Sequence, residues 1–388
     1  MPKEVYVFSD IEFGGGTITD DFASDGLLVD ILEKISQSKG EVDLVLNGDT
    51  LDFLKCPIVR KRFTFYLEHI TVNIALEKLG YIYKSHETVF NALKLFLQDK
   101  KHKLYFLHGN HDYELLFPEI QEKMKSILES KSILFQQTYF ENKIYIEHGH
   151  QYDIYFGYDP KKIFRNYKGR KELNIPALFS GFNAFFMDQK EIHPFLERIE
   201  DRKSILRLMP GYKAHITYLI LRFYFYHLLF SIYNYILRDY FKIYLKIIFV
   251  TLYNFVRKTF DIQLRTLMKS VKRVPSTTKL VIFGHAHEKV NEYHTKINKW
   301  VLVLDTWREE YSFSDNLKFL VPKTKRYAKI IVEDNQLKVT LTDLSPKGGK
   351  ILFEKVCEDE VKYSKKVFDD RHNLHLKDYE IDETNFTL

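Results

Sequence analysis

Five short clusters in the chain hold side chains that bind divalent metal ions or transfer protons. They are Asp10-Ile11-Glu12, Gly48-Asp49-Thr50-Leu51-Asp52, Gly109-Asn110-His111-Asp112, His148-Gly149-His150 and Gly284-His285-Ala286-His287. Carboxylate, amide and imidazole groups of this kind can hold two cations about 3.5–4 Å apart, with one carboxylate bridging them. Glycine beside these side chains lets the backbone turn sharply and lets a phosphate approach closely. The clusters therefore predict a two-metal hydrolytic centre.

Each cluster follows a short apolar run that is typical of a buried strand. The runs are Val5–Ser9, Val42–Asn47, Lys103–His108, Lys143–Glu147 and Leu280–Phe283. Helix-like segments at Gly26–Lys39 and His86–Asp99 separate the first three runs. Strand–helix alternation predicts an α/β fold, in which ligands bind at the carboxyl ends of strands. The clusters occupy those ends.

Residues 151–279 interrupt this alternation, and strand-like runs resume after the last cluster. The later runs are Lys299–Leu304, Ala328–Glu333 and Gln336–Leu341. We therefore predict a core formed by residues 1–150 and 280–344, a helical insertion at 151–279 and a charged C-terminal tail at 345–388. Because the tail is weakly periodic and rich in charge, we expect it to be partly disordered or loosely packed.

The composition is that of an ordinary globular protein, with 45% hydrophobic and 28% charged residues among 388. The formal net charge of +6 suits an anionic substrate or surface, but does not by itself indicate nucleic-acid binding. Only two cysteines occur, Cys56 and Cys357, which excludes a disulfide framework and favours a reducing compartment. The N-terminal sequence has no pattern of a secretory signal, so we expect a cytoplasmic protein.

The order of the five clusters resembles the motif order of the calcineurin-like metallophosphoesterase superfamily. The resemblance covers roughly residues 1–150 and 280–342. It implies a four-layer α/β sandwich, in which two β-sheets are flanked by helices, here with a large helical insertion. It also implies a metal-dependent phosphohydrolase, in which a metal-bridging hydroxide attacks phosphorus and the cations offset the charge on the phosphoryl oxygens.

The same resemblance implies which residues hold the metals. Asp49 would be the carboxylate that bridges both cations. One cation would also bind Asp10, the side chain at position 12 and His287. The other cation would also bind Asn110, His148 and His285. We expect Mn²⁺, ahead of Fe²⁺, Mg²⁺ and Zn²⁺.

The resemblance further implies which residues act on the substrate. His111 would lie beside the substrate phosphate as general acid or charge stabiliser, and Asp112 would orient it. We expect Asp52 and His150 to contact these residues or the substrate, although a turn residue and a plain loop histidine are the simpler interpretations.

Glu12 departs from the family pattern, which usually has histidine at this position. We expect Glu12 to ligate, and the additional carboxylate would then favour the hard cations Mn²⁺, Mg²⁺ and Fe²⁺. Two alternatives stay open. Glu12 points away and its metal binds weakly, or one acid of the following loop takes its place, namely Asp20, Asp21 or Asp25.

The insertion is aromatic and basic. Fifteen Phe and Tyr residues lie in Lys213–Phe260, and eleven Lys and Arg face only two acids between Lys213 and Arg273. Three interpretations compete: a packed helical subdomain, a lipid-facing hairpin or interfacial helix, and a transmembrane span at Ile216–Leu237. The span would contain Arg222, and a central arginine costs about 2.5–3.5 kcal/mol on insertion scales.

An apolar insertion at this place resembles that of the UDP-diacylglucosamine pyrophosphatases, where a helical segment holds acyl chains. We therefore expect hydrolysis of a phosphate ester, phosphodiester or pyrophosphate, first on a small or lipid-linked phosphate substrate and next on a nucleotide. Residues 213–273 would contact a membrane surface, so that the protein is peripherally membrane-associated. A nuclease is one alternative, although the apolar insertion argues against nucleic acid. A catalytically impaired scaffold, like the retromer subunit of this fold, is the other.

Overall fold

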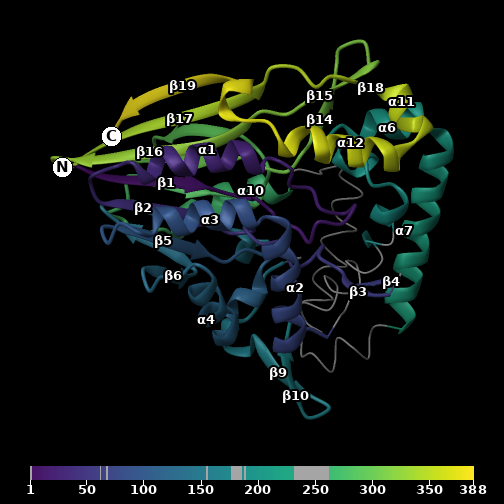
Figure 1. Ribbon diagram of the computed structural model, residues 1–388, viewed down its shortest axis with the longest axis horizontal. Helices are drawn as coiled ribbons and strands as arrows, with labels where there is room; N and C mark the ends of the chain where they lie inside the picture. Colours follow the sequence, from purple (N-terminus) through teal and green to yellow (C-terminus); the bar gives the residue numbers. More distant parts are fainter. Residues whose placement is uncertain are drawn as a thin grey trace.

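Two β-sheets lie at the centre of the molecule, and helices cover their outer faces (Figure 1). The computed structural model describes residues 2–61, 63–66, 69–153, 156–175, 186–187, 189–230 and 262–388. The statements below concern these residues.

The larger sheet has a parallel and an antiparallel half. Its strands are β1 (Lys3–Phe8), β2 (Val42–Asn47), β5 (His102–Leu107), β6 (Ile133–Gln136), β16 (Lys325–Glu333), β17 (Gln336–Pro346) and β19 (Tyr379–Thr387). They lie in the order β19-β17-β16-β1-β2-β5-β6. Strands β1, β2, β5 and β6 are parallel, whereas β16, β17 and β19 pair antiparallel. The parallel half carries the first three clusters at one edge.

The smaller sheet joins strands from both sides of the insertion. Its strands are β7 (Thr138–Glu141), β8 (Ile144–Glu147), β11 (Leu280–Phe283), β12 (Val290–His294) and β13 (Lys299–Val303). They lie in the order β12-β13-β11-β8-β7. Because β11 is parallel to β8, the fourth and fifth clusters follow neighbouring strand ends.

The remaining elements are helices, two short strand pairs (β3–β4 and β9–β10) and a small three-stranded sheet in the order β14-β15-β18. The helices are α1 (Asp25–Ser36), α2 (Val72–Ser85), α3 (Glu87–Phe96), α4 (Pro118–Ile127), α6 (Arg202–Leu208), α7 (Pro210–Phe230), α10 (Ile262–Ser270), α11 (Phe353–Glu358) and α12 (Glu360–His372). The short strands are β3 (Ile58–Arg60), β4 (Phe63–Phe65), β9 (Phe164–Tyr167), β10 (Arg170–Leu173), β14 (Tyr311–Phe313), β15 (Phe319–Pro322) and β18 (Ile351–Leu352). Single 3₁₀ turns are Tyr113–Leu116, His150–Tyr152, Pro160–Lys162, Leu196–Arg198, Val271–Arg273 and Leu376–Asp378.

Alternation of side chains along the strands builds the layers. On β1, Val5 and Val7 pack into a core shared by the two sheets, whereas Tyr6 and Phe8 pack into a core shared with the helices. A third core places Leu267 of α10 against the other face of the smaller sheet. Each fully buried large apolar side chain contributes roughly 1.5–3 kcal/mol. The predicted four-layer sandwich is thus confirmed.

The C-terminal segment is folded, and the expectation of a loose or partly disordered tail is wrong. Strand β19 pairs with β17 over nine residue pairs, from Lys338 with Thr387 to Pro346 with Tyr379. It is an edge strand with an almost fully exposed sequence, which explains its charge and weak apolar periodicity. Helix α12 buries Val367 and Arg371 and so also belongs to the folded core.

The insertion is only partly helical where it is described. It begins with a 3₁₀ turn and the β9–β10 hairpin, followed by helices α6, α7 and α10. Among the described helices, none combines the length and apolarity that a membrane crossing requires. Residues 231–260, which are most of the aromatic segment Lys213–Phe260, lie outside the described residues. The same is true of the end of the proposed span at Ile216–Leu237.

Candidate metal centre

The five clusters meet at one edge of the two sheets. Strands β1, β2 and β5 run parallel in the larger sheet, and β8 and β11 run parallel in the smaller one. The backbone also joins clusters, because the amide of His285 donates to Asp10 Oδ1 (3.1 Å) and the amide of His111 donates to Asp49 Oδ1 (2.8 Å). The first of these bonds joins residues 275 positions apart.

One group of potential ligands surrounds Asp49. Ligand atoms of Asp49, His148 and His285 lie within 4.8 Å of one another, and all three residues are buried. His148 donates from Nδ1 to the carbonyl of Asn47 (2.9 Å), which turns Nε2 toward Asp49 Oδ2, 3.2 Å away. Asn110 Oδ1 is buried and has no hydrogen-bond partner among the described residues.

A second group consists of Asp10, Glu12 and His287. His287 Nε2 lies 3.4 Å from Asp10 Oδ1 and 3.4 Å from Glu12 Oε1. Glu12 Oε1 is buried and lacks a hydrogen-bond partner in the part of the chain that the structure describes. His148 Nε2, which is 3.2 Å from Asp49, is also only 3.9 Å from Asp10 Oδ1. The two groups therefore adjoin, as a shared carboxylate at Asp49 requires.

The donor atoms of both groups fit divalent cations. Electron-rich atoms that face one another in a buried site repel unless a proton or a cation lies between them. Burial by itself lowers the pKa of His148, but Asp49 and Asp10 outweigh it and raise the pKa to about 9, so a proton can take that place. The unpartnered Asn110 Oδ1 and Glu12 Oε1 are acceptors that a cation would satisfy. Carboxylate, amide and imidazole ligands together suit Mn²⁺, Fe²⁺, Mg²⁺ or Zn²⁺.

The candidate ligands have strained backbones. Positive φ angles occur at Asp10 (52°), Glu12 (59°), Asp49 (48°), His285 (67°) and His287 (51°). Such conformations cost on the order of 1–3 kcal/mol each and cluster at functional sites. The fold holds one of them firmly, since the carbonyl of Asp10 accepts from Thr306 Oγ1 (3.0 Å) and from the amide of Trp307 (2.9 Å).

Two glycines bring the ligand loops together. A Cβ atom at Gly109 would collide with the carboxylate of Asp49, and one at Gly284 would collide with Ser9 Oγ and the carboxylate of Asp10. Neither position therefore has room for a side chain. The sequence predicted that glycines here would let a phosphate approach closely. In the structure they let the ligand-bearing loops approach one another.

His111 lies beside both groups, and 13% of its side chain is exposed. Its Nε2 is 3.9 Å from Asp49 Oδ2, and its Nδ1 is 3.0 Å from Asp52 Oδ1. Burial lowers the pKa of His111, but Asp49, Glu12 and Asp52 together raise it to about 9. A protonated imidazole that a carboxylate fixes at Nδ1 can donate from Nε2 to a substrate oxygen.

The structure corrects the role expected of Asp112. Its carboxylate accepts from the backbone amides of Gly109 (2.5 Å) and Thr50 (2.9 Å), and so ties the loop after β5 to the loop after β2. The carboxylate at His111 Nδ1 belongs to Asp52, three residues beyond Asp49. Asp112 thus fixes the backbone that carries the ligands, and Asp52 orients the histidine.

Glu12 has its two oxygens in different surroundings. Oε1 faces His287, whereas Oε2 contacts Lys55 Nζ and lies 3.5 Å from Arg308 Nε. Lys55 Nζ also contacts Asp21 (3.1 Å) and Asp52 (3.2 Å), and its side chain is only 5% exposed. Lys55 therefore compensates the negative charge of Glu12.

No pattern in the sequence indicated this buried cation cluster. Arg308 continues it to Asp21 (3.0 Å) and Glu197 (3.1 Å), and Lys190 bridges the same two acids at 2.5 and 3.0 Å. Lys55 could have been suspected, because it follows the last acid of the second cluster by three residues. Nothing in the sequence marks Lys190 or Glu197, which lie within the insertion.

The acids of the loop after Glu12 are engaged elsewhere. Asp21 belongs to the cation cluster, Asp20 accepts from the amide of Gly16 (2.8 Å), and Asp25 contacts His86 Nδ1 (2.9 Å). These contacts favour Glu12 over the three acids as the ligand at this position. His86 Nε2 also contacts Asp20 Oδ2 (3.1 Å), so one buried imidazole binds two carboxylates.

This arrangement predicts a pH dependence of stability. Burial lowers the pKa of His86, but Asp20 and Asp25 raise it to about 10, above the value of about 6.5 in the unfolded chain. The charged His86 therefore stabilises the fold fully below about pH 6.5, and this contribution is lost as pH rises toward 10. We expect the urea midpoint to fall between pH 6.5 and 9.5, and to fall less steeply in His86→Gln. Equal slopes for both proteins would contradict the assignment.

His150 and Asp153 lie next to the candidate ligands His148 and His285. The His150 ring is fully buried, stacks on Tyr158 at 5.9 Å and lies 5.4 Å from the His148 ring. Burial holds the pKa of His150 well below its usual range, so the ring is neutral. Asp153 Oδ2 lies 3.3 Å from His285 Nε2. Since Asp153 follows the predicted boundary at residue 150, the start of the insertion contributes to the centre.

Comparison with known proteins identifies relatives of the chain. The calcineurin-like phosphoesterase family matches residues 4–198, which is half of the chain and includes the first four clusters. No curated protein matches significantly. Similar solved structures include a Vps29 single mutant from Entamoeba histolytica (8% identity, 99% of each chain, TM-score 0.30). Others are a dimetal phosphatase from Danio rerio (10%, 87% of this chain and 96% of that chain, 0.35) and a putative 5'-nucleotidase from Staphylococcus aureus (11%, 95% and 58%, 0.30).

Proposed function

The chain belongs to the calcineurin-like phosphoesterase family, and from this premise we propose that it cleaves a phosphate ester, phosphodiester or pyrophosphate bond in an amphiphilic substrate. Membership makes it a metal-dependent phosphohydrolase. The observation that carries the proposal is the convergence of buried, electron-rich ligand atoms around Asp49, with a histidine beside them that is partly open to solvent. We propose Mn²⁺ as the metal.

The residues of the centre would have different roles in the proposed reaction. Two bound cations would polarise the phosphoryl oxygens and activate water as the nucleophile. Asp49 belongs to two close sets of potential ligands, one with His148 and His285 and one with Glu12 and His111. Glu12 offers its other oxygen, Oε1, to His287. His111 donates from Nε2 to the leaving oxygen or to a phosphoryl oxygen, while Asp52 holds Nδ1. Asp112 keeps the loops in register.

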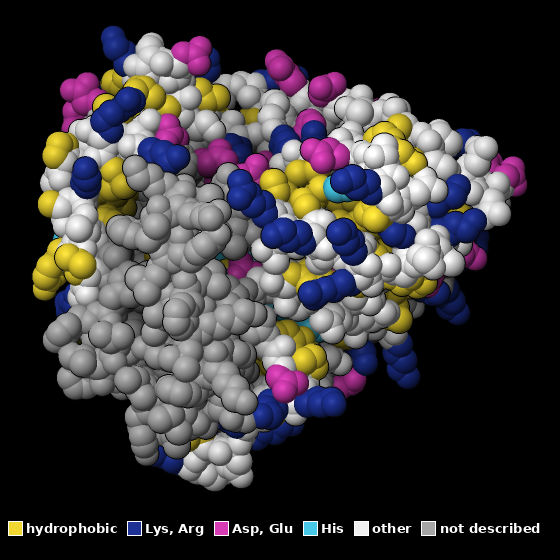
Figure 2. Space-filling view, turned by 180° about the vertical axis from the view of Figure 1, so that it is seen from behind, with side chains coloured by type: hydrophobic (Ala, Val, Ile, Leu, Met, Phe, Trp, Pro, Cys, Tyr) yellow, Lys and Arg dark blue, Asp and Glu magenta, His cyan; other side chains and the backbone are white. Residues whose placement is uncertain are grey.

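Exposed apolar side chains support an amphiphilic substrate. On the β3–β4 hairpin, Phe63 is 68% and Phe65 is 45% exposed, and on α7, Leu221 is 64% exposed. Lys and Arg side chains are spread between apolar ones over the described part of one face (Figure 2). Apolar and basic groups together suit a molecule with a lipid tail and a phosphate head, or a membrane surface that presents it.

Metal content and hydrolysis test the proposed reaction. The full-length protein is assayed by elemental analysis, and its Mn²⁺-dependent turnover is measured on an aryl phosphodiester and an aryl phosphomonoester. We expect about two metals per chain in the wild type and loss of both metal and turnover in Asp49→Asn. A folded protein that binds no divalent cation and turns over neither compound would favour the scaffold alternative.

The substrate class has its own prediction. We expect kcat/KM to rise with acyl chain length in a series of lipid phosphates that share one head group. Phe65→Ser should lower kcat/KM severalfold for the long-chain member only, because the soluble aryl phosphate needs no apolar contact. Phe140→Ser is the matched control, since Phe140 is also 45% exposed but lies on β7. Independence of chain length would exclude the amphiphilic substrate and leave the phosphohydrolase standing.

A further inference from the structure

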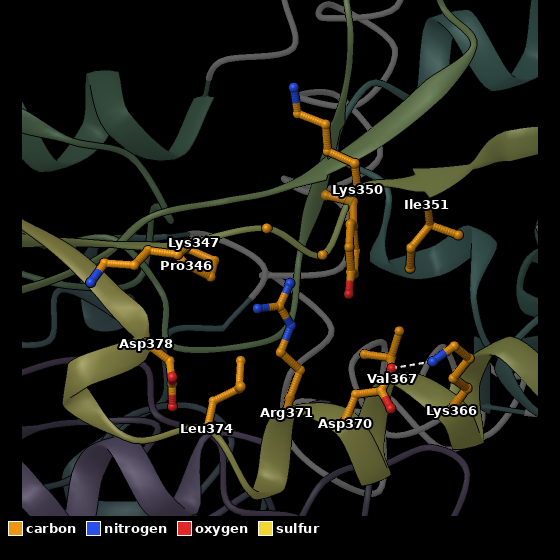
Figure 3. Close-up of a pocket in the computed structure, with 13 residues that line it drawn as sticks. Pro346, Lys347, Lys350, Ile351, Lys366, Val367, Asp370, Arg371, Leu374 and Asp378 are labelled. Carbon is orange, nitrogen blue, oxygen red and sulfur yellow. Dashed lines mark hydrogen bonds and ion pairs between the residues drawn. The ribbon is translucent and has the colours of Figure 1, made fainter.

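A cavity of about 380 Å³ lies between helix α12 and the loop that follows β17 (Figure 3). The loop has the sequence Pro346-Lys347-Gly348-Gly349-Lys350, and all five residues line the cavity. None of the lining residues belongs to the metal centre described above. The function proposed for the metal centre therefore leaves this cavity unexplained.

Arg371 of α12 is the central side chain of the cavity. It is 4% exposed, and in Figure 3 its guanidinium points from the helix toward the glycine loop. Nε lies 3.6 Å from Glu309 Oε2, and the hydroxyl groups of Tyr311 and Tyr379 also interact with the guanidinium. Nη2 is nevertheless buried and makes no hydrogen bond of good geometry with the residues that the structure describes. An unsatisfied buried donor costs about 1–3 kcal/mol, and more when it is charged. The guanidinium thus needs an acceptor.

The loop is shaped around this guanidinium. Gly348 and Gly349 have φ angles of 129° and 81°, which other residues rarely adopt. A Cβ atom at Gly349 would collide with Arg371 Nη2, so only glycine fits there. The amides of Lys347 and Gly348 already donate to the carbonyls of Asp378 (2.9 Å) and Pro346 (2.8 Å). This leaves the amides of Gly349 and Lys350 in the loop to donate to an anion, as backbone amides of tight turns do. The loop and the arginine are independent features that point to the same kind of ligand.

The charges of the cavity favour an anion. Four cationic and two acidic side chains line it. Both acids have partners, because Asp370 pairs with Lys366 and Asp378 Oδ2 accepts from the amide of His375 (3.0 Å). Lys350, at the mouth, is exposed and adds positive charge.

We propose that the cavity binds the phosphate group of a small organic phosphate. Arg371 and the glycine loop recognise the phosphate, since a guanidinium matches its oxygens with parallel hydrogen bonds. Ile351, Val367 and Leu374 line the same cavity and offer apolar walls for the organic part. The volume lies in the range of about 300–1,000 Å³ that is usual for small-molecule sites and exceeds the needs of a single phosphate ion.

Isothermal titration of the full-length, metal-loaded protein tests the proposal. The probes are inorganic phosphate and phenylphosphonate, which has a carbon–phosphorus bond that a phosphohydrolase does not cleave. We expect two phenylphosphonate sites per chain, one lost in Asp49→Asn and the other weakened about 10–100-fold in Arg371→Met, which removes a charged hydrogen-bond donor. Tighter binding of phenylphosphonate than of phosphate supports an organic ligand, and equal binding of both supports phosphate recognition alone.

A second pair of variants keeps the proposal testable if Arg371→Met does not fold. Lys350→Glu changes an exposed lysine that lines the cavity, and Lys365→Glu makes the same change at an exposed lysine of α12 that does not. We expect only Lys350→Glu to weaken this second site, by about 3–10-fold. The proposal is overturned if the wild type has only one phenylphosphonate site and Asp49→Asn loses it. It is also overturned if Lys350→Glu and Lys365→Glu bind phenylphosphonate with the same affinity.

Discussion

Replacing His111 by Asn should lower kcat by about 10²–10⁴-fold and leave the metal content unchanged. In the proposed assignment the side chain carries a proton near the substrate and its ring holds neither cation. A ring nitrogen of His111 lies within 4.8 Å of ligand atoms of Glu12 and Asp49, so the metal content of the variant tests that assignment. The backbone amide of His111, which donates to Asp49 Oδ1, remains in the variant, so the geometry of Asp49 is kept. Elemental analysis and steady-state kinetics on the same preparation separate these effects.

The leaving group decides between the two roles open to His111. If the histidine protonates the leaving oxygen, its loss should slow an alkyl phosphate far more than an aryl phosphate, because an aryl oxide leaves without a proton. If it stabilises phosphoryl charge, both should slow equally. Asp52→Asn, which keeps the side-chain shape at Nδ1, should show the same pattern with a smaller loss. A loss below about fivefold on both substrates, where a general acid supplies about 10²–10⁴-fold, would contradict either role.

The sequence predicted the parts of this protein that depend on local pattern and chain order. Strand β2 and strand β11 begin and end where their apolar runs do, because fully buried strands need continuous hydrophobic sequence. The ligand clusters could be recognised because parallel strands place their ends together. The edge strand β19 escaped prediction, since a strand that is exposed on both faces carries no apolar alternation.

Contacts between distant segments could not be predicted from the sequence. The choice between Asp52 and Asp112 as partner of His111 depends on which carboxylate the turn directs toward the ring, and both acids lie close to ligands in the chain. Likewise, Lys190 reaches the cation cluster from the insertion, where its neighbours in sequence give no sign of a buried charge. Pairing of charges is a property of the folded chain, so composition alone cannot reveal it.

Lys55→Met should destabilise the protein by about 3–5 kcal/mol, which is the usual cost of breaking a buried ion pair by removing one partner. The variant keeps the volume of the side chain but leaves Glu12, Asp21 and Asp52 without their shared ammonium. Lys78→Met is the matched control. Lys78 is also buried (2% exposed), and its Nζ donates to the carbonyl of Phe53 (2.7 Å), so its loss should cost less, about 1.5–3 kcal/mol, which is usual for a hydrogen bond from a charged donor.

The dependence of this loss on Mn²⁺ tests whether Glu12 is a ligand. In a chelator, Lys55→Met leaves Arg308, 3.5 Å from Oε2, as the remaining positive charge at Glu12, whereas a cation bound at Oε1 would supply the charge that is lost. Urea unfolding should therefore show a deficit that shrinks as Mn²⁺ is added, beyond the stabilisation that the wild type gains from the same concentration. Combining Lys55→Met with Glu12→His removes both charges and should recover about 0.5–3 kcal/mol as a coupling energy. A deficit that is insensitive to Mn²⁺, together with additive variants, would mean that Glu12 serves only the cation cluster, and that Asp10, Asp49 and His287 hold their metal without it.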